Sequence, residues 1–140
     1  MATPFHDVYS RALFRLRDTN LARLNDADKE YMLHQYMLSA IGDFQPKCLK
    51  DLSARTESGF SDVLSDEEQE ILALGISYYW LSAQVLNNEL LKNKLSTKDY
   101  TYFSPANLLR ESVGLRDQIR KEYKNRITQY TYDHGNLALD

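Results

Sequence analysis

The sequence predicts an all-α protein: a helical bundle with two long helices, shorter N-terminal helices, one long loop and an extended C-terminal tail. Apolar residues recur at spacings of three and four in four segments, which is the pattern of amphipathic helices. Two of those segments also open with residues typical of helix starts, at Ser65 and at Ser104-Pro105. At 140 residues the chain has the size of one ordinary domain, so we assign residues 1–140 to a single domain.

The composition is that of a folded protein outside the membrane. Hydrophobic residues make up 43% and charged residues 26% of the chain, values that exclude disorder. No apolar run approaches the roughly 18 residues of a membrane span, and the N-terminus lacks a signal-peptide pattern. We therefore expect a soluble intracellular protein. The net charge of -3 argues weakly against a general nucleic-acid binder.

The N-terminal part is expected to hold two shorter helices. Residues 1–25 form a helix that Pro4 opens, followed by a linker. Residues 26–64 form a second helix, which ends at Gly42-Asp43, and then a long loop without periodicity. Four apolar residues of this loop are expected to hold it against the body: Phe44, Leu49, Leu52 and Phe60.

Residues 65–95 are predicted to form the central helix. Ser65 and Glu68 have the spacing of a capping box, and several acidic residues fill the first turns. We interpret this acidic cluster as helix-start chemistry that suits the helix dipole, rather than as a metal site.

The C-terminal third is predicted to hold the second long helix. Residues 96–104 form an aromatic hinge, residues 105–134 the helix, and residues 135–140 a tail. Glycines at 75 and 114 lie inside the two long helices, where each costs about 1 kcal/mol relative to alanine. We expect Gly75 and Gly114 to mark a close approach between helices, so that leucine at either position would destabilise the fold.

The sequence carries no catalytic, cofactor or metal signature. Three histidines lie in three separate segments, and the pair Glu30–His34 supplies only two ligands, too few for a metal site. The single cysteine, Cys48, lies near two lysines that would favour a thiolate if the site is exposed, but a small packing residue is the simpler interpretation. We therefore expect a protein that is not an enzyme and binds no cofactor.

The last helix is more basic than the rest of the chain. Its cations could contact nucleic-acid phosphates. The simpler alternative, which we favour, is a solvated face with pairs four residues apart such as Asp117–Lys121 and Glu122–Arg126.

Aromatic residues are the unusual feature of this chain. Ten tyrosines suit interfaces as well as cores. The candidate interface residues are those of the hinge and of the end of the last helix: Lys98, Tyr100, Tyr102, Phe103, Tyr130, Tyr132 and Asp133. The alternative for the hinge aromatics is that they fold back on their own bundle.

Several short blocks, in order, resemble the small head–tail connector (neck or portal adaptor) proteins of tailed bacteriophages. The blocks are Tyr31-Met32-Leu33 with Leu38–Phe44, Leu64–Leu72 with Tyr79-Trp80-Leu81, Ser96–Tyr100 with Phe103–Asn107, and Tyr130–Asp133. The similarity covers roughly residues 31–133. The ordered series carries the resemblance rather than any one block.

The resemblance implies a structural virion protein without enzymatic activity, made in the host cytoplasm. In that family identical subunits form a ring, typically twelvefold, beneath the portal protein, and the next neck or tail protein follows. DNA passes through the ring without sequence-specific binding, and here Arg116, Arg120 and Lys124 would face that channel. The alternative functions are a small helical nucleic-acid-binding regulator that uses the basic last helix, and an accessory subunit of an enzyme.

Overall fold

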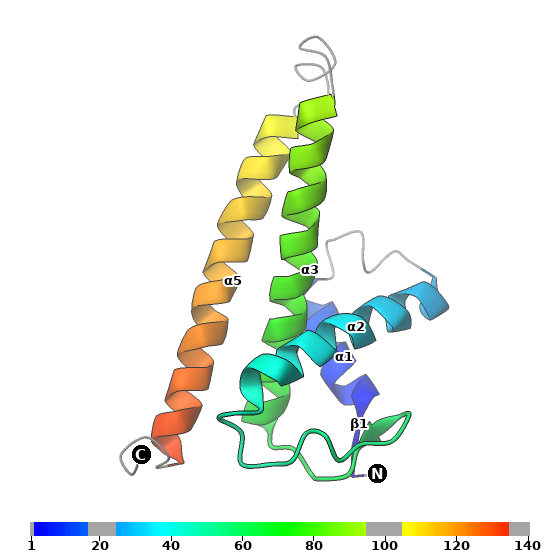
Figure 1. The fold of residues 1–140 in the computed structure, drawn as a ribbon, viewed down its shortest axis with the longest axis vertical. Coiled ribbons are helices and arrows are strands. Elements are labelled where there is room, and N and C mark those ends of the chain that lie inside the picture. The colour runs from blue at the N-terminus through cyan, green and yellow to red at the C-terminus, as the bar shows by residue number, and fades with distance from the viewer. Residues whose placement is uncertain (1, 17–24, 95–104, 135–140) are drawn as a thin grey trace.

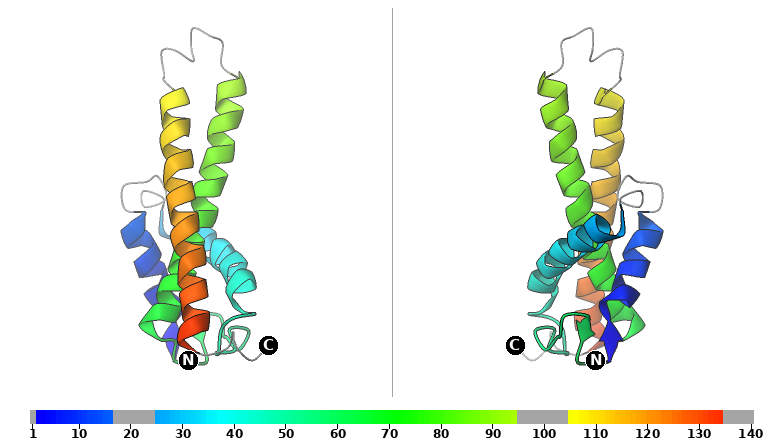
Figure 2. Two further views of the ribbon diagram at one scale, coloured as in Figure 1. Left: turned by 90° about the vertical axis from the view of Figure 1, so that its left-hand side faces the viewer. Right: turned by 90° about the vertical axis from the view of Figure 1, so that its right-hand side faces the viewer.

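The computed structural model describes residues 2–16, 25–94 and 105–134. Within these ranges it confirms the all-α class, with four helices: α1 (Phe5–Arg15), α2 (Asp26–Phe44), α3 (Asp66–Lys94) and α5 (Pro105–Asp133). The long helices α3 and α5 run antiparallel as a hairpin (Figure 1). Helices α1 and α2 pack against its lower half from opposite sides (Figure 2). Among these helices none combines the length and apolar character needed to cross a membrane.

Helix α3 is the central element, as its apolar pattern predicts. All three other helices contact it, and residues 71–77 are buried without a break. Its start is the predicted capping box: the Ser65 hydroxyl accepts from the Glu68 amide at 3.1 Å, and the Ser65 amide donates to the Glu68 carboxylate at 2.8 Å. These bonds satisfy backbone groups that a helix start leaves unpaired.

Helix α2 extends two residues past its predicted end. Its start matches the prediction, with the Asn25 side chain accepting from the Asp28 amide at 2.9 Å. Gly42 does not end it, because Phe44 is fully buried and packs edge-to-face on Tyr130 with ring centroids 5.0 Å apart. The tertiary contact outweighs the glycine as a stop signal.

The two interior glycines differ. A Cβ at Gly75 would overlap the Ala40 side chain of α2 and lie 2.9 Å from the Tyr123 hydroxyl of α5, so the predicted close approach is confirmed there. A Cβ at Gly114 would meet nothing within 4 Å, and the prediction for this residue is wrong. Gly75 lies where α2 and α5 both pack on α3, whereas no described side chain of another helix lies that close to Gly114.

The predicted long loop contains a short strand. Residues Gly59–Phe60 (β2) pair antiparallel with Thr3–Pro4 (β1), and the Phe5 amide donates to the Ser58 carbonyl at 2.9 Å. Phe44, Leu52 and Phe60 are buried as expected, but Leu49 is exposed, so its predicted packing role is wrong. The loop is therefore held to the N-terminus as well as to the helices.

Candidate docking groove

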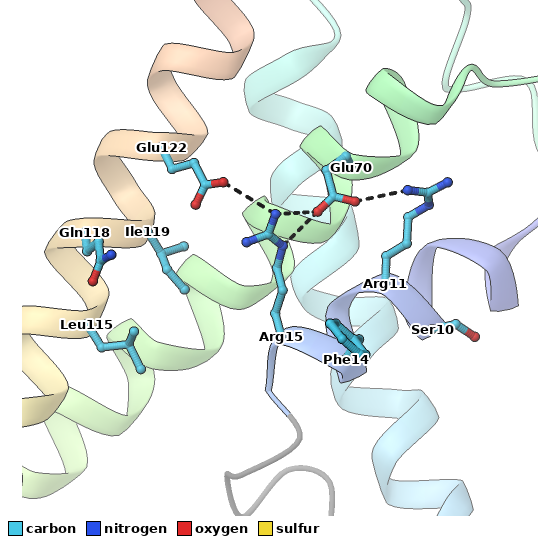
Figure 3. Close-up of a pocket in the computed structure, with 9 residues that line it drawn as sticks. All are labelled: Ser10, Arg11, Phe14, Arg15, Glu70, Leu115, Gln118, Ile119 and Glu122. Atoms are coloured by element: carbon cyan, nitrogen blue, oxygen red, sulfur yellow. Dashed lines mark hydrogen bonds and ion pairs between the residues drawn. The ribbon is translucent and has the colours of Figure 1, made fainter.

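A groove of about 750 Å³ lies between α1 and α5, with the start of α3 at its floor (Figure 3). Its walls come from segments about a hundred residues apart in the chain. The lining residues are Ser10, Arg11, Phe14, Arg15, Glu70, Leu115, Gln118, Ile119 and Glu122.

Ion pairs fix the polar side of the groove. The Arg15 Nε donates to Glu70 Oε1 at 2.8 Å, and its Nη2 reaches Glu122 Oε1 at 3.4 Å. Arg11 Nη1 donates to the second Glu70 oxygen at 3.1 Å. The Arg15 guanidinium on α1 therefore contacts carboxylates of both α3 and α5, and these ion pairs connect the three helices that form the groove.

The Glu70 carboxylate is kept ionised by these partners. Burial alone would raise the pKa of Glu70, but hydrogen bonds from Arg15 and Arg11 outweigh it and hold the pKa below the ordinary value. With both arginines already neutralised by carboxylates, the groove has little free charge to attract a small anion.

Two apolar side chains give the groove its binding character. Phe14 is 68% exposed and Leu115 is 42% exposed, while Ile119 beside them is buried. Large exposed apolar side chains around a hollow are typical of protein-docking sites. The arrangement suits an aromatic or aliphatic side chain that has a polar tip.

A smaller hollow of about 420 Å³ continues the groove along α5. It shares Gln118 and Glu122 with the groove and adds two cations, Lys121 and Arg126. Arg126 pairs with Glu122 at 3.7 Å, as the sequence predicted, whereas Asp117 pairs with its neighbour Arg116 at 3.1 Å. Lys121 forms no salt bridge with another described residue, so the predicted Asp117–Lys121 pair is not observed.

Tyr130 is not an interface residue, contrary to the prediction. Its side chain is fully buried; the hydroxyl donates to Glu68 at 2.7 Å and accepts from the Leu49 amide at 3.0 Å. Burial, and then the Glu68 carboxylate, raise the pKa of Tyr130, so the hydroxyl stays protonated. The side chain faces the start of α3 because α5 lies against it at this end.

Glu68 lies at the centre of this buried polar cluster. Besides Tyr130 and its capping bond, it accepts from the Lys50 ammonium at 3.1 Å. Burial alone would raise the pKa of Glu68, but these hydrogen bonds lower it overall. The carboxylate thus joins the loop, α3 and α5.

Two other predicted interface residues are exposed at the end of α5. Tyr132 is 62% exposed, and Asp133 is exposed and accepts from Gln129 at 2.8 Å. They remain available for contacts, but they lie outside the groove. The hinge residues Lys98, Tyr100, Tyr102 and Phe103 lie outside the described residues.

The basic residues assigned to a DNA channel form a stripe along α5. Arg116, Arg120 and Lys124 are four residues apart, so they lie on one side of the helix. Arg120 and Lys124 are exposed and form no salt bridge with another described residue. Arg120 follows Gln118 by two residues, about 200° around the axis, so the stripe and the groove lie on different sides of α5.

The remaining reactive side chains have structural partners. Burial raises the pKa of the Cys48 thiol, so the thiolate suggested by the nearby lysines is disfavoured. His34 contacts the Tyr9 hydroxyl at 3.0 Å and packs on Phe5 instead of forming a metal pair with Glu30. Over the described ranges no group of three or more potential metal ligands is found.

None of the groove residues was predicted from the sequence as a site residue, and Glu122 was named only for its pair with Arg126. A signal was present: arginines at 11 and 15 share one face of the first helix, and acidic residues open the central helix. Opposite charges on two amphipathic helices indicate which faces meet, but not that Phe14 remains exposed beside them.

Comparison of the chain with protein-family models, with curated proteins and with solved structures finds no match.

Proposed function

We propose that this chain is a head–tail adaptor of a tailed bacteriophage, a structural virion protein made in the host cytoplasm. Its copies form a ring, twelvefold as in the connectors it resembles, beneath the portal protein and carry the next neck or tail protein. The groove between α1 and α5 is the observation that carries this proposal, because it offers an apolar contact site outside the hydrophobic core.

The layout of α5 supports the proposal. A ring subunit around a channel must contact its neighbours on its sides and present another surface to the channel. The groove lies on one side of α5, and the stripe of Arg116, Arg120 and Lys124 lies on another. In the proposed ring the stripe faces the DNA and attracts its backbone without reading its sequence.

The proposal assigns the chain no catalytic step and no cofactor. Its function is to bind: the portal above, identical copies at the sides and the next tail component below. The polar residues of the groove are used in ion pairs that connect the helices, which is a structural use of Arg15 and Glu70.

The decisive experiment mixes the purified chain with its candidate portal protein and images the complex by electron microscopy. The adaptor proposal predicts a stoichiometric ring at one end of the portal. It also predicts weak affinity for free duplex DNA.

The competing function, a nucleic-acid-binding regulator, predicts the reverse result. Such a protein binds DNA tightly, with an affinity that falls steeply with salt. If the chain is a regulator, the double variant Arg120→Glu, Lys124→Glu should lose DNA binding. If the chain is an adaptor, the same double variant should still bind the portal protein. Tight DNA binding by a chain that does not bind the portal would contradict the adaptor proposal.

A further inference from the structure

We propose that the groove between α1 and α5 binds the start of α2 from a second copy of this chain, with Tyr31 as the inserted side chain. The biological role of this contact rests on the adaptor proposal, since it identifies the neighbour that fills the groove. The contact itself follows from two surfaces of the described residues.

The first surface is the hollow groove described above. Its apolar part, Phe14 and Leu115, is exposed, and its rim carries polar groups from α1 and α5. Lys121 on the adjoining hollow is a cation with no salt bridge to another described residue. The groove arginines are paired with carboxylates, so Lys121 at the edge of the groove supplies the positive charge that is unpaired among the described residues, and the surface favours an aromatic side chain that has carboxylates beside it.

The second surface, which we call the Tyr31 face, has that composition. Tyr31 is 64% exposed and lies at the edge of another hollow of about 680 Å³. Two exposed carboxylates line the same hollow, Glu30 on α2 and Glu57 on the loop, and Asp26 and Asp28 are exposed at the start of α2. The cation of this stretch, Lys29, lies 4.0 Å from Asp26, so the face is negative overall.

The two surfaces match in kind. A tyrosine ring fits an apolar hollow, and its hydroxyl can reach the polar rim. The acidic surroundings of Tyr31 meet the Lys121 side of the groove, and opposite charges favour this pairing over contacts between like surfaces.

Each copy can use both surfaces at once. The hollows beside Tyr31 and beside Phe14 share no lining residue. Helix α1 contributes to both, but Tyr9 and Phe14 point about 140° apart around its axis. A contact between two different surfaces is heterologous, so it joins copies head to tail and closes into a ring when the rotation allows.

The test uses one variant for each surface and a mixing experiment. Phe14→Asp blocks the groove and Tyr31→Asp blocks the face; both side chains are exposed, so folding should be retained, as circular dichroism and melting would verify. The matched control is Leu86→Asp, at an exposed apolar residue of α3 outside both surfaces. Mass is measured by sedimentation velocity up to about 1 mM protein, a range that detects weak contacts.

The expected result is specific to a head-to-tail contact. The unmodified chain and the Leu86 variant self-associate, and each blocked variant loses about 30-fold or more in self-association, as for an aromatic hot spot. A 1:1 mixture of the two blocked variants forms a dimer and nothing larger, because one intact groove meets one intact face.

Other outcomes would overturn the inference. These are an unmodified chain that stays monomeric at about 1 mM, blocked variants that assemble normally, and a mixture that stays monomeric. The portal experiment separates this failure from that of the adaptor proposal. A portal-bound ring unaffected by Phe14→Asp and Tyr31→Asp contradicts only the groove contact, whereas head-to-tail assembly without portal binding contradicts only the adaptor function.

Discussion

The lower half of the α3–α5 hairpin is covered by α1 and α2, whereas the upper half extends beyond both helices (Figure 1). In the lower half, residues 71–77 of α3 are all buried, and Gly75 has no room for a Cβ. In the upper half, Leu86 is exposed and Gly114 has open space around it. The same pair of helices thus contributes an unbroken buried segment at one end and exposed positions, such as Leu86, at the other.

Polar contacts also connect the helices in the lower half. In the lower half, Asp43 at the end of α2 accepts hydroxyl groups from Tyr79 of α3 and from Tyr123 of α5, the latter at 3.0 Å. Burial, and then Asp43, raise the pKa of Tyr123, so its hydroxyl remains a donor. The buried Tyr123 hydroxyl therefore has a defined partner, and among the described residues no buried side-chain nitrogen or oxygen lacks one.

The largest expected difference between the two halves is at the glycines. Gly75→Leu should lower the free energy of unfolding by about 3 kcal/mol or more, because the added side chain overpacks the crossing. Gly114→Leu should be neutral or raise it by about 0.8 kcal/mol, since leucine favours helix. Urea denaturation of both variants tests this, and equal losses would contradict the division.

A second comparison uses one substitution at two neighbouring tyrosines. Tyr130→Phe should lower the free energy of unfolding by about 1–3 kcal/mol, because buried Glu68 and the Leu49 amide lose their hydrogen bonds with the hydroxyl. Tyr132→Phe should change the stability by less than about 0.5 kcal/mol, since this side chain is exposed. Thermal melting of the two variants measures the effect. A similar loss for Tyr132 would mean that the end of α5 packs differently.

Acid should weaken the lower half through its carboxylates. Because the pKa of Glu68 is lower in the folded state than its ordinary 4.5, its contribution is present above pH 4.5 and is lost as the pH falls through the folded value. Glu68→Gln should lower the free energy of unfolding by about 1–2 kcal/mol at neutral pH and should not change it in strong acid. Melting temperatures measured from neutral pH to strong acid test this difference. The control is Glu57→Gln, at an exposed side chain, which should change the melting temperature at neither end of the range.

The smallest expected effects are at the groove's ion pairs. Arg15→Gln should lower the free energy of unfolding by less than about 1 kcal/mol, because the guanidinium is partly exposed and solvent screens its ion pairs. Arg126→Gln should lower the free energy of unfolding still less, because Arg126 has a single, longer contact with Glu122. Denaturation at low and at high salt compares the two. If Arg15→Gln lowered the free energy of unfolding as much as Gly75→Leu, the groove would belong to the core rather than to the protein surface.

Local signals predicted the helices well. The capping bonds at Ser65 and the apolar spacing of α3 depend on residues a few positions apart, so the sequence contains the whole pattern. Gly75 was identified for the same reason: a glycine inside a long apolar helix is costly without a close neighbour.

Features that depend on distant segments were not predictable in the same way. Tyr130 and Tyr132 have similar sequence surroundings, and only the direction of α5 against α3 decides which one is buried. Gly114 has the same helical setting as Gly75, but no third helix crosses there. The strand pairing with residues 3–4 and the groove each join segments more than fifty positions apart.

In the proposed assembly, copies of this chain join through the groove and the Tyr31 face. The most direct measurement is cross-linking of a chain that keeps Phe14 and Tyr31 and carries one cysteine beside each surface, Gln118→Cys at the groove and Ala27→Cys at the Tyr31 face, in a Cys48→Ser background, treated with a short bismaleimide. We predict a ladder of covalent multimers on a denaturing gel, and at most dimers when either engineered cysteine is present alone. A double-cysteine chain that yields only monomers would contradict the account.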